Sequence, residues 1–364
     1  MTSASSPLTP EQVARYLDRI GLPAHARTWL REGPGGAHAL EALTLLQQRH
    51  MAAVPFENLG LHYAAEPGLA QEADAVFDAV VARRRGGVCP QVHPLFARLL
   101  RSLGFAAYCT GARLNAPASV AADPAMDKSK VAYGPWIHVV VLVHLPAQPQ
   151  AGLPAAWYLI DTSTGPFGAT YPQPLVHDRP DACRDMAPRQ RRMLYGPVPG
   201  LSVAAAAADG TSSSSSSSSG AGGPGWWRMQ LREGGAEPWM DVCCFVPAEW
   251  TPADFQIMVA GLASLGAGWF TSRVVCFRVL LDDDDDDNGD KDGDGHGAPV
   301  GYLIAWQDEL RRWYKGTVEV LQRFYCEADR VAALEEEFGI VLTEEEQAAI
   351  VGRPTELADV TGEY

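Results

Sequence analysis

The chain has 364 residues, of which 47% are hydrophobic, and this is enough to fill the cores of two or three folded domains. Its formal net charge is −15, but residues 282–294 alone hold nine Asp and one Lys, which leaves −7 for the rest of the chain. That remainder is only mildly acidic and lacks the broad basic surface that nucleic-acid binding needs. These features exclude a disordered protein and a nucleic-acid-binding protein.

Seven cysteines are spread along the chain without a C-x-x-C pair, so the sequence favours neither a disulfide framework nor a zinc site. The first twenty residues lack the apolar core of a secretion signal. The longest apolar run, 136–145, is too short to cross a bilayer and contains two histidines. We therefore expect a cytoplasmic protein with reduced thiols that binds no membrane.

The first part of the chain is predicted to be a helical bundle, over residues 1–107. Thr9 is a suitable N-cap for the first helix and is followed by a proline. Apolar residues then recur at spacings of three and four over 41–54 and 71–85, which is typical of helices that bury one face. A last helix of the bundle is expected to end at Gly104, because glycine commonly terminates helices.

The hydrophobic pattern then changes to that of β-strands, over residues 108–247. Runs of β-branched and aromatic residues bounded by Pro, Gly and Ser occur at 136–145, 156–162, 225–231 and 239–246. Their irregular connections suggest a small barrel or a strongly curved sheet. A Ser-rich stretch, 204–225, has side chains too small and polar to pack, so we expect a disordered insertion there.

Residues 248–364 are predicted to form an α/β unit. A helix and a strand are expected over 248–280, and an acidic insertion follows at 282–297. Beyond the insertion we expect two strands, one near 301–309 and one over 311–321, and a final helix.

The acidic insertion has part of the sequence pattern of a calcium-binding loop. Asp290, Asp292 and Asp294 fit the first half of a calcium-binding loop. The twelfth position of that loop falls on Gly301, where a bidentate glutamate is required. We therefore interpret the segment as a solvated linker and predict no metal site.

The segment RRRGGVCPQVHPLF, 83–96, places a cysteine where a glycine-containing loop turns into a helix. Cys89 is expected at the N-cap and Pro90 at the first helical position. There the thiol meets the positive end of the helix dipole and unpaired backbone N–H groups, which favour thiolate over thiol. Most cysteines are inert buried side chains, so this location indicates a nucleophile only together with a base.

A nucleophilic thiol requires a base, usually histidine, and a group that orients the base. His138 lies inside an apolar strand, a costly place for an imidazole whose nitrogens are not hydrogen-bonded. His144 shares that strand but lies beside a loop, where solvent can satisfy it. Asp161 ends an apolar run before a TSTG turn, although an aspartate there is usually just a turn former. The order Cys, His, Asp suggests a triad without establishing one.

Several segments in chain order resemble the arylamine N-acetyltransferases. They are VPFENL (54–59), RRGGVC (84–89), HPLFARLLRSLGF (93–105), the strand histidine at 138, YLIDTSTGPFG (158–168), and the C-terminal FTSRVVCFRVL and LEEEFGIVLTEEE. The resemblance implies an α+β fold made of a helical bundle, a β-barrel and an α/β lid. It also implies a cysteine-protease-like core at the active site.

By this resemblance Cys89, His138 and Asp161 form a catalytic triad. The implied reaction is a ping-pong transfer in which Cys89 takes an acetyl group from acetyl-coenzyme A. An arylamine, arylhydrazine or hydroxylamine nitrogen then accepts it. The partners are therefore small molecules, with acetyl-coenzyme A acting as a substrate, and we expect a monomer.

The resemblance also implies roles for four further residues. Phe56 would line the acceptor pocket, and Gly134 would contact the coenzyme. Glu57 and Arg85 would form a supporting ion pair. For Phe56 a core aromatic, and for Glu57 and Arg85 an ordinary helix salt bridge, are equally good interpretations.

Two departures from the family pattern leave alternatives open. His93 stands where the family usually has an asparagine, and a TSTG turn follows Asp161 where Val-Gly-Phe-Gly is commoner. We interpret His93 as a helix-surface imidazole, with competition for the thiolate as the alternative. A malonyl- or propionyl-coenzyme A donor, a binding protein without turnover, and a thiol hydrolase or transglutaminase-like enzyme remain open.

Overall fold

The computed structural model describes residues 6–119, 127–201, 225–264, 268–282, 297–314 and 317–357. Most of the two predicted insertions, including Asp290, Asp292 and Asp294, lies outside these described residues. No helix in the described ranges is both long enough and apolar enough to cross a bilayer.

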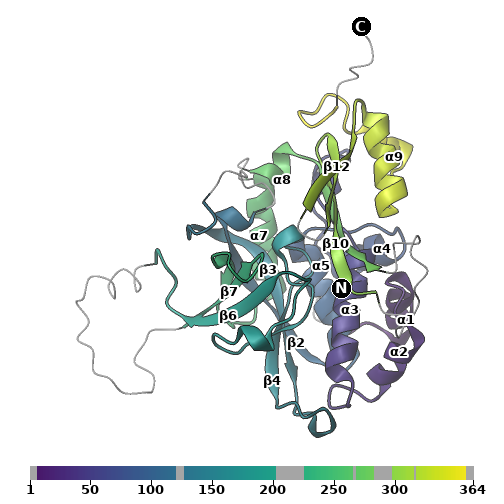
Figure 1. Cartoon of the computed structure of the whole chain (residues 1–364). Coiled ribbons are helices and arrows are strands. Elements are labelled where there is room, and N and C mark those ends of the chain that lie inside the picture. Colours follow the sequence, from purple (N-terminus) through teal and green to yellow (C-terminus); the bar gives the residue numbers. More distant parts are fainter. Residues whose placement is uncertain are drawn as a thin grey trace.

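The N-terminal helices gather on one side of the molecule (Figure 1). They are α1 (Pro10–Arg19), α2 (Ala24–Arg31), α3 (Ala39–Ala53), α4 (Ala73–Val81) and α5 (Cys89–Ser102). The predicted start of α1 is confirmed, because Thr9 accepts a hydrogen bond from the Gln12 backbone and the Gln12 side chain accepts one from the Thr9 N–H. α5 is buried along most of its length and packs on β2 and β3 of the adjacent sheet.

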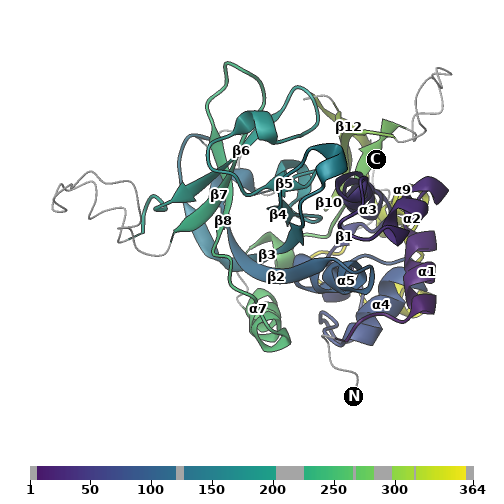
Figure 2. The same cartoon turned by 90° about the horizontal axis from the view of Figure 1, so that it is seen from below.

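That sheet contains seven antiparallel strands in the order β5-β4-β3-β2-β8-β7-β6. The strands are β2 (Ala106–Asn115), β3 (Tyr133–Leu145), β4 (Ala156–Ile160), β5 (Gln173–Pro174), β6 (Gln190–Gly196), β7 (Trp226–Arg232) and β8 (Met240–Phe245). A bridge between His177 and Met193 brings the segment after β5 against β6, so the sheet curls into a nearly closed barrel (Figure 2). This confirms the predicted curved sheet.

Alternate residues of the curved sheet fill two different cores. Val139, Val141 and Val143 of β3 pack with the helices in one core. Val140 and Leu142 point to the other side and pack inside the barrel with strands β7 and β8. β3 is therefore buried on both faces, which explains its continuous apolar sequence.

A second sheet has the order β1-β9-β10-β11-β12. Its strands are β1 (Phe56–Glu57), β9 (Val275–Leu281), β10 (Pro299–Trp306), β11 (Glu309–Tyr314) and β12 (Thr317–Arg323). The helices of this part of the chain are α7 (Pro252–Ser264), α8 (Trp269–Ser272), α9 (Glu327–Phe338) and α10 (Glu344–Ala348). α9 packs on β9 and lies beside this sheet in Figure 1, whereas α7 packs on α5 and on β3 of the first sheet. The predicted combination of helical bundle, barrel and α/β unit in an α+β fold is confirmed.

Two details of this second sheet correct the sequence interpretation. Residues 311–321, expected as one strand, belong to two strands that pair antiparallel, with Tyr314 opposite Thr317. The Lys-Gly pair in the sequence between them is a turn signal. In addition, β1 lies within the predicted helical bundle yet pairs with β9, Phe56 opposite Phe277. The domain boundaries at 107 and 247 stay predictions.

Candidate active site

Helix α5 begins at Cys89 itself, one residue earlier than predicted. Val88 is the N-cap, in extended conformation, and its N–H donates to the side chain of Gln91 at 3.1 Å. That bond satisfies the backbone before the helix and lets Cys89 adopt the first helical position, with Pro90 second. Cys89 is buried, and its thiol donates to the Ile137 carbonyl at 3.5 Å.

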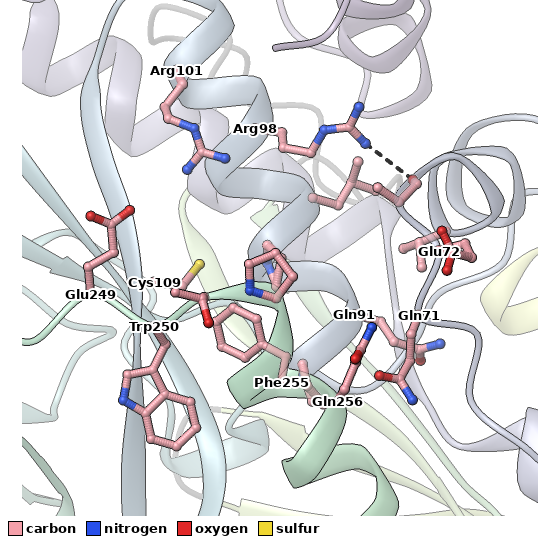
Figure 3. Close-up of a pocket in the computed structure, with 17 residues that line it drawn as sticks. Gln71, Glu72, Gln91, Arg98, Arg101, Cys109, Glu249, Trp250, Phe255 and Gln256 are labelled. Carbon is pink, nitrogen blue, oxygen red and sulfur yellow. Dashed lines mark hydrogen bonds between the residues drawn. The ribbon is translucent and has the colours of Figure 1, made fainter. Parts of the chain in front are cut away.

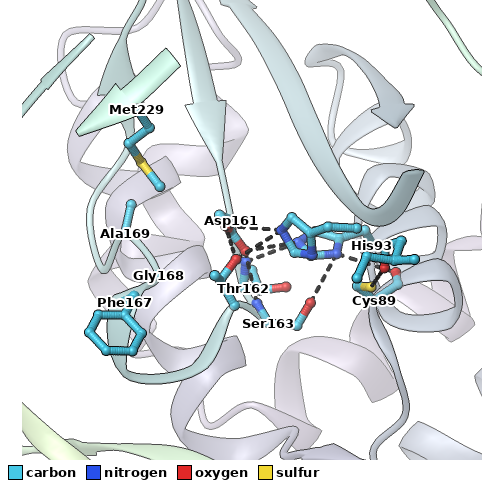
Figure 4. Close-up of polar contacts among 12 residues, drawn as sticks. Cys89, His93, Asp161, Thr162, Ser163, Phe167, Gly168, Ala169 and Met229 are labelled. Atoms are coloured by element: carbon cyan, nitrogen blue, oxygen red, sulfur yellow. Dashed lines mark hydrogen bonds and ion pairs between the residues drawn. The ribbon is translucent and has the colours of Figure 1, made fainter. Parts of the chain in front are cut away.

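The structure brings Cys89, His138 and Asp161 together. β3 carries His138 directly after Ile137, the residue whose carbonyl the thiol contacts. Asp161 directly follows β4, the strand paired with β3, and its Oδ2 lies 3.1 Å from His138 Nε2. The thiol lies within hydrogen-bond reach of the His138 ring, so the imidazole stands between sulfur and carboxylate. Figure 4 shows Asp161 and Cys89 at opposite ends of this set of polar contacts.

The groups on both sides of the His138 ring, Asp161 and Cys89, favour its protonated form. Burial opposes a charge on the ring, yet Asp161 and Cys89 together raise the pKa of His138 to about 10. For Asp161, burial acts to raise the pKa, but the His138 ring outweighs it and brings the pKa of the carboxyl below its ordinary value. The arrangement suits an imidazolium that stands between a thiolate and a carboxylate.

The turn after β4 adds three polar contacts that the sequence did not predict. The Thr164 hydroxyl bonds Asp161 Oδ2 and also lies 2.8 Å from His138 Nε2. The Ser163 N–H donates to Asp161 Oδ1 at 3.1 Å. The carboxylate of Asp161 is fully buried. Its own turn orients it and supplies the hydrogen bonds that water would otherwise make.

The prediction that His93 lies on the helix surface is wrong. His93 is fully buried, because it lies one helical turn after Cys89 on the face of α5 that packs under the turn after β4. Its Nε2 accepts the Thr162 backbone N–H at 2.9 Å, so its lone pair is occupied and the ring does not compete for the Cys89 proton. Burial lowers the pKa of His93 to about 4.

The three residues predicted from VPFENL and RRGGVC lie beside the site in β1 and the loop before α5. Glu57 Oε1 lies 3.2 Å from Arg85 Nη2, and Arg85 Nη1 lies 3.0 Å from Glu346 Oε1. Phe56 stacks on Phe277 with ring centroids 4.6 Å apart. The ion pair thus ties the loop before α5 to β1 and to the C-terminal part of the chain. That Phe56 lines an acceptor pocket stays a prediction.

Gly134 lies in β3, four residues before His138. Its carbonyl accepts a hydrogen bond from Arg113 at 3.0 Å. A Cβ added at Gly134 would meet only the Leu114 carbonyl oxygen, at 3.7 Å, so the position is open to a neighbouring group. Contact with the coenzyme stays a prediction.

A cavity of about 470 Å³ lies along α5 (Figure 3). Pro94 and Arg98 of α5 line it together with Trp250 and Phe255. Cys89 lies on the face of the helix opposite Arg98, because the two residues are nine positions apart and a helix turns by a further half turn over that distance. Cys89, His138 and Asp161 are not among the residues that line the cavity.

Within the described parts of the chain, no group of three or more His, Cys, Asp or Glu side chains is arranged to hold a metal ion. The seven cysteines are all free. The groups that the site brings together are a thiol, an imidazole and a carboxylate.

Comparison with known proteins identifies relatives of this fold and sequence. The sequence model of a family described as N-acetyltransferase matches residues 39–179, which include Cys89, His138 and Asp161. N-malonyltransferase FDB2 of Fusarium pseudograminearum is 26% identical over 310 residues, covering 85% of this chain and 81% of that protein.

Solved structures agree in fold. The arylamine N-acetyltransferase of Mycobacterium abscessus aligns with a TM-score of 0.66 and 21% identity over 96% of this chain and 100% of that one. The arylamine N-acetyltransferase of Mycobacterium marinum, solved in complex with CoA, aligns with a TM-score of 0.62 and 20% identity over 93% of this chain and 98% of that one.

Proposed function

Because the chain belongs to the arylamine N-acetyltransferase family, we propose that it transfers an acyl group from an acyl-coenzyme A to an aromatic amine through a thioester on Cys89. The observation that carries the proposal is the buried contact of the Cys89 thiol with a His138 ring that Asp161 holds at 3.1 Å. This is the arrangement that a thiolate nucleophile and its proton carrier require.

In the first half-reaction the Cys89 thiolate attacks the thioester carbonyl carbon of the acyl-coenzyme A. The carbon–sulfur bond to the coenzyme breaks, and His138 gives its proton to the departing thiolate. The acyl group is then bound to Cys89, and His138 is neutral. Asp161 keeps Nε2 protonated and so leaves Nδ1 as the nitrogen that faces sulfur.

In the second half-reaction the nitrogen of an arylamine, arylhydrazine or hydroxylamine attacks the acyl carbon. His138 takes a proton from this nitrogen, and the bond from carbon to Cys89 sulfur breaks. The product is an amide, a hydrazide or a hydroxamic acid, according to the acceptor. The thiolate–imidazolium pair is restored. Phe56 and the aromatic rings around it are the proposed apolar surface for the acceptor.

Malonyl-coenzyme A is a second candidate donor beside acetyl-coenzyme A. The observation that favours it is the similarity to an N-malonyltransferase over 85% of the chain, whereas the acetyltransferase structures share only about a fifth of their residues with it. Propionyl-coenzyme A is a further donor of the same chemistry.

The test is a search for the acyl-enzyme. Purified protein is mixed separately with acetyl-, propionyl- and malonyl-coenzyme A without an acceptor, and its intact mass is measured. We expect a gain of one acyl group with at least one donor, lost on addition of an arylamine as the N-acyl product forms. The donor that acylates fastest identifies the preferred acyl group.

Two variants locate the adduct. Cys89→Ser is expected to abolish it. Cys109→Ser is the matched control, because Cys109 is also buried but burial raises the pKa of its thiol to about 12, so the adduct should persist. An adduct with no donor overturns the transferase proposal and favours a binding protein, and peptide cleavage without coenzyme would indicate a thiol hydrolase.

A further inference from the structure

His93 connects the two segments that carry the nucleophile and the carboxylate. From α5 its Nε2 accepts the Thr162 backbone N–H at 2.9 Å, and its Nδ1 lies 3.1 Å from Ser163 Oγ. The same Nδ1 lies 3.2 Å from the carbonyl of Cys89, one turn earlier in the helix. One ring thus contacts the residue that bears the thiol and two residues of the turn that follows Asp161.

These contacts fix the tautomer of the ring. A backbone N–H can only donate, so Nε2 must be the unprotonated nitrogen of a neutral imidazole. Nδ1 then carries the hydrogen and shares it between Ser163 Oγ and the Cys89 carbonyl. Every polar atom of the ring is used, which leaves the ring no freedom to turn.

The turn held by His93 also sets the position of the triad. Within it Ser163 and Thr164 hydrogen-bond the Asp161 carboxylate, and Thr164 also contacts His138 Nε2. A movement of the turn relative to α5 would therefore change the distance from the Cys89 sulfur to the His138–Asp161 pair. Reactivity depends steeply on such distances, since a displacement of about 1 Å costs about 100-fold in rate.

We propose that His93 is a positioning residue, which by its bonds to Thr162 and Ser163 holds the turn that carries Asp161 against the first turn of α5. The proposal rests on the proposed function only in that it assigns the thiol a catalytic use. The two departures in the sequence, the histidine at 93 and the Thr-Ser-Thr turn, are then one coupled feature, because their side chains and backbone are in direct contact.

Three substitutions at this position separate the bonds that the ring makes. His93→Gln extends far enough to place an acceptor near Nε2 and so keeps the bond to Thr162. His93→Asn reaches only the place of Nδ1, keeps the contacts with Cys89 and Ser163, and leaves the Thr162 N–H buried without a partner. His93→Phe fills the same space with no hydrogen bond.

The readout is the rate of Cys89 alkylation by iodoacetamide from about pH 5 to pH 9, followed by the kcat and KM for the acyl donor. We expect losses of about fivefold for Gln, about 30-fold for Asn and about 100-fold for Phe, in kcat and in alkylation rate, with KM within about twofold.

His50→Gln is the matched control. His50 is also fully buried and packs on Phe96 of α5, but it hydrogen-bonds Tyr16 and not the turn after β4. We expect it to lower thermal stability and to leave the alkylation profile unchanged. If His93→Phe does not fold, Ser163→Ala still tests the link and should cost about threefold, because Nδ1 retains the Cys89 carbonyl.

Wild-type alkylation behaviour in His93→Phe, or equal rates in the Asn and Gln variants, would overturn the proposal. Alkylation needs no acyl donor, so this result is independent of whether any acyl-coenzyme A forms an adduct. Failure of the positioning role and failure of the acyltransferase function are therefore distinguishable.

Discussion

The surroundings of His138 and of His93 differ although both rings are fully buried and lie with centroids only 5.7 Å apart. Asp161 is close to both, with His93 Nε2 at 3.7 Å and His138 Nε2 at 3.1 Å. Yet the pKa of His138 is raised to about 10, whereas burial lowers that of His93 to about 4.

The difference lies in the groups that the ring nitrogens of each histidine contact. His138 has Asp161 on one side and the Cys89 thiol on the other, and both stabilise a positive ring. His93 receives a backbone N–H, which requires a neutral nitrogen. Burial alone thus does not decide the charge of an imidazole, and one aspartate can lie close to a charged ring and to a neutral one.

The largest test of this comparison is removal of the shared carboxylate. In Asp161→Asn the His138 ring loses the strongest influence that keeps it charged, so kcat/KM and the rate of Cys89 acylation should fall about 10⁴-fold. The matched control is Asp241→Asn, which removes a buried carboxylate bonded to Tyr133 and Arg228. The control should lose stability and retain Cys89 reactivity, and a similar rate loss in both variants would contradict the special role of Asp161.

The contribution of the thiol to the charge on His138 is tested by Cys89→Ala. Without sulfur the ring loses one of the two groups that favour its charged form, so its pKa should fall below the wild-type value. A titration of the ring proton by NMR measures this shift. The His93 signals provide the internal control and should not move, since His93 contacts the Cys89 backbone and not its sulfur.

The neutral state of His93 predicts how stability changes in acid. Between pH 6.5 and about 4 the unfolded chain binds a proton on this ring and the folded chain does not, so folding stability falls as the pH falls. His93→Gln should reduce the slope of the unfolding free energy against pH, by about 1.4 kcal/mol per pH unit at most. Urea unfolding over this range measures it, and parallel curves for the two proteins would show that His93 is charged in the native state. His50 and His62, whose pKa values burial also lowers, keep part of the slope in both.

The smallest effect sharpens the comparison on the His138 side. Thr164→Val keeps the shape of the side chain but removes the hydroxyl that bonds Asp161 and His138. We expect a loss of about tenfold in kcat, the size of one charge-assisted hydrogen bond. Thr164→Ser keeps the hydroxyl and should restore most of the rate, and equal losses in both variants would indicate a packing role instead.

The helical, curved-sheet and α/β units could be predicted from local sequence, which also marked Cys89, His138 and Asp161 as candidates, whereas their grouping into one site was implied by the family resemblance. Apolar periods located α1, α3, α5 and the strands β3 and β4, and the motif around Cys89 indicated the nucleophile. β1 was missed because a two-residue strand has no period of its own and its partner, β9, lies more than 200 residues away in the chain. Pairing over such a separation leaves no local signal.

His93 and Thr164 were missed for a related reason. Helical spacing places His93 on the same face as Cys89 and Phe96, and that face is the signal that it is buried. What covers it, the turn after β4, lies about 70 residues further on, and no pattern within α5 indicates it. Sequence showed that His93 and the Thr-Ser-Thr turn were unusual, but only their contact explains them.

The most direct test of the central claim, that His138 is charged beside Cys89 while His93 is neutral, is the ¹⁵N NMR spectrum of the histidine rings at neutral pH, assigned with His93→Gln. The account predicts both ring nitrogens of His138 protonated, and for His93 one protonated Nδ1 and one unprotonated Nε2. A neutral His138 under these conditions would contradict the thiolate–imidazolium pair and with it the proposed mechanism.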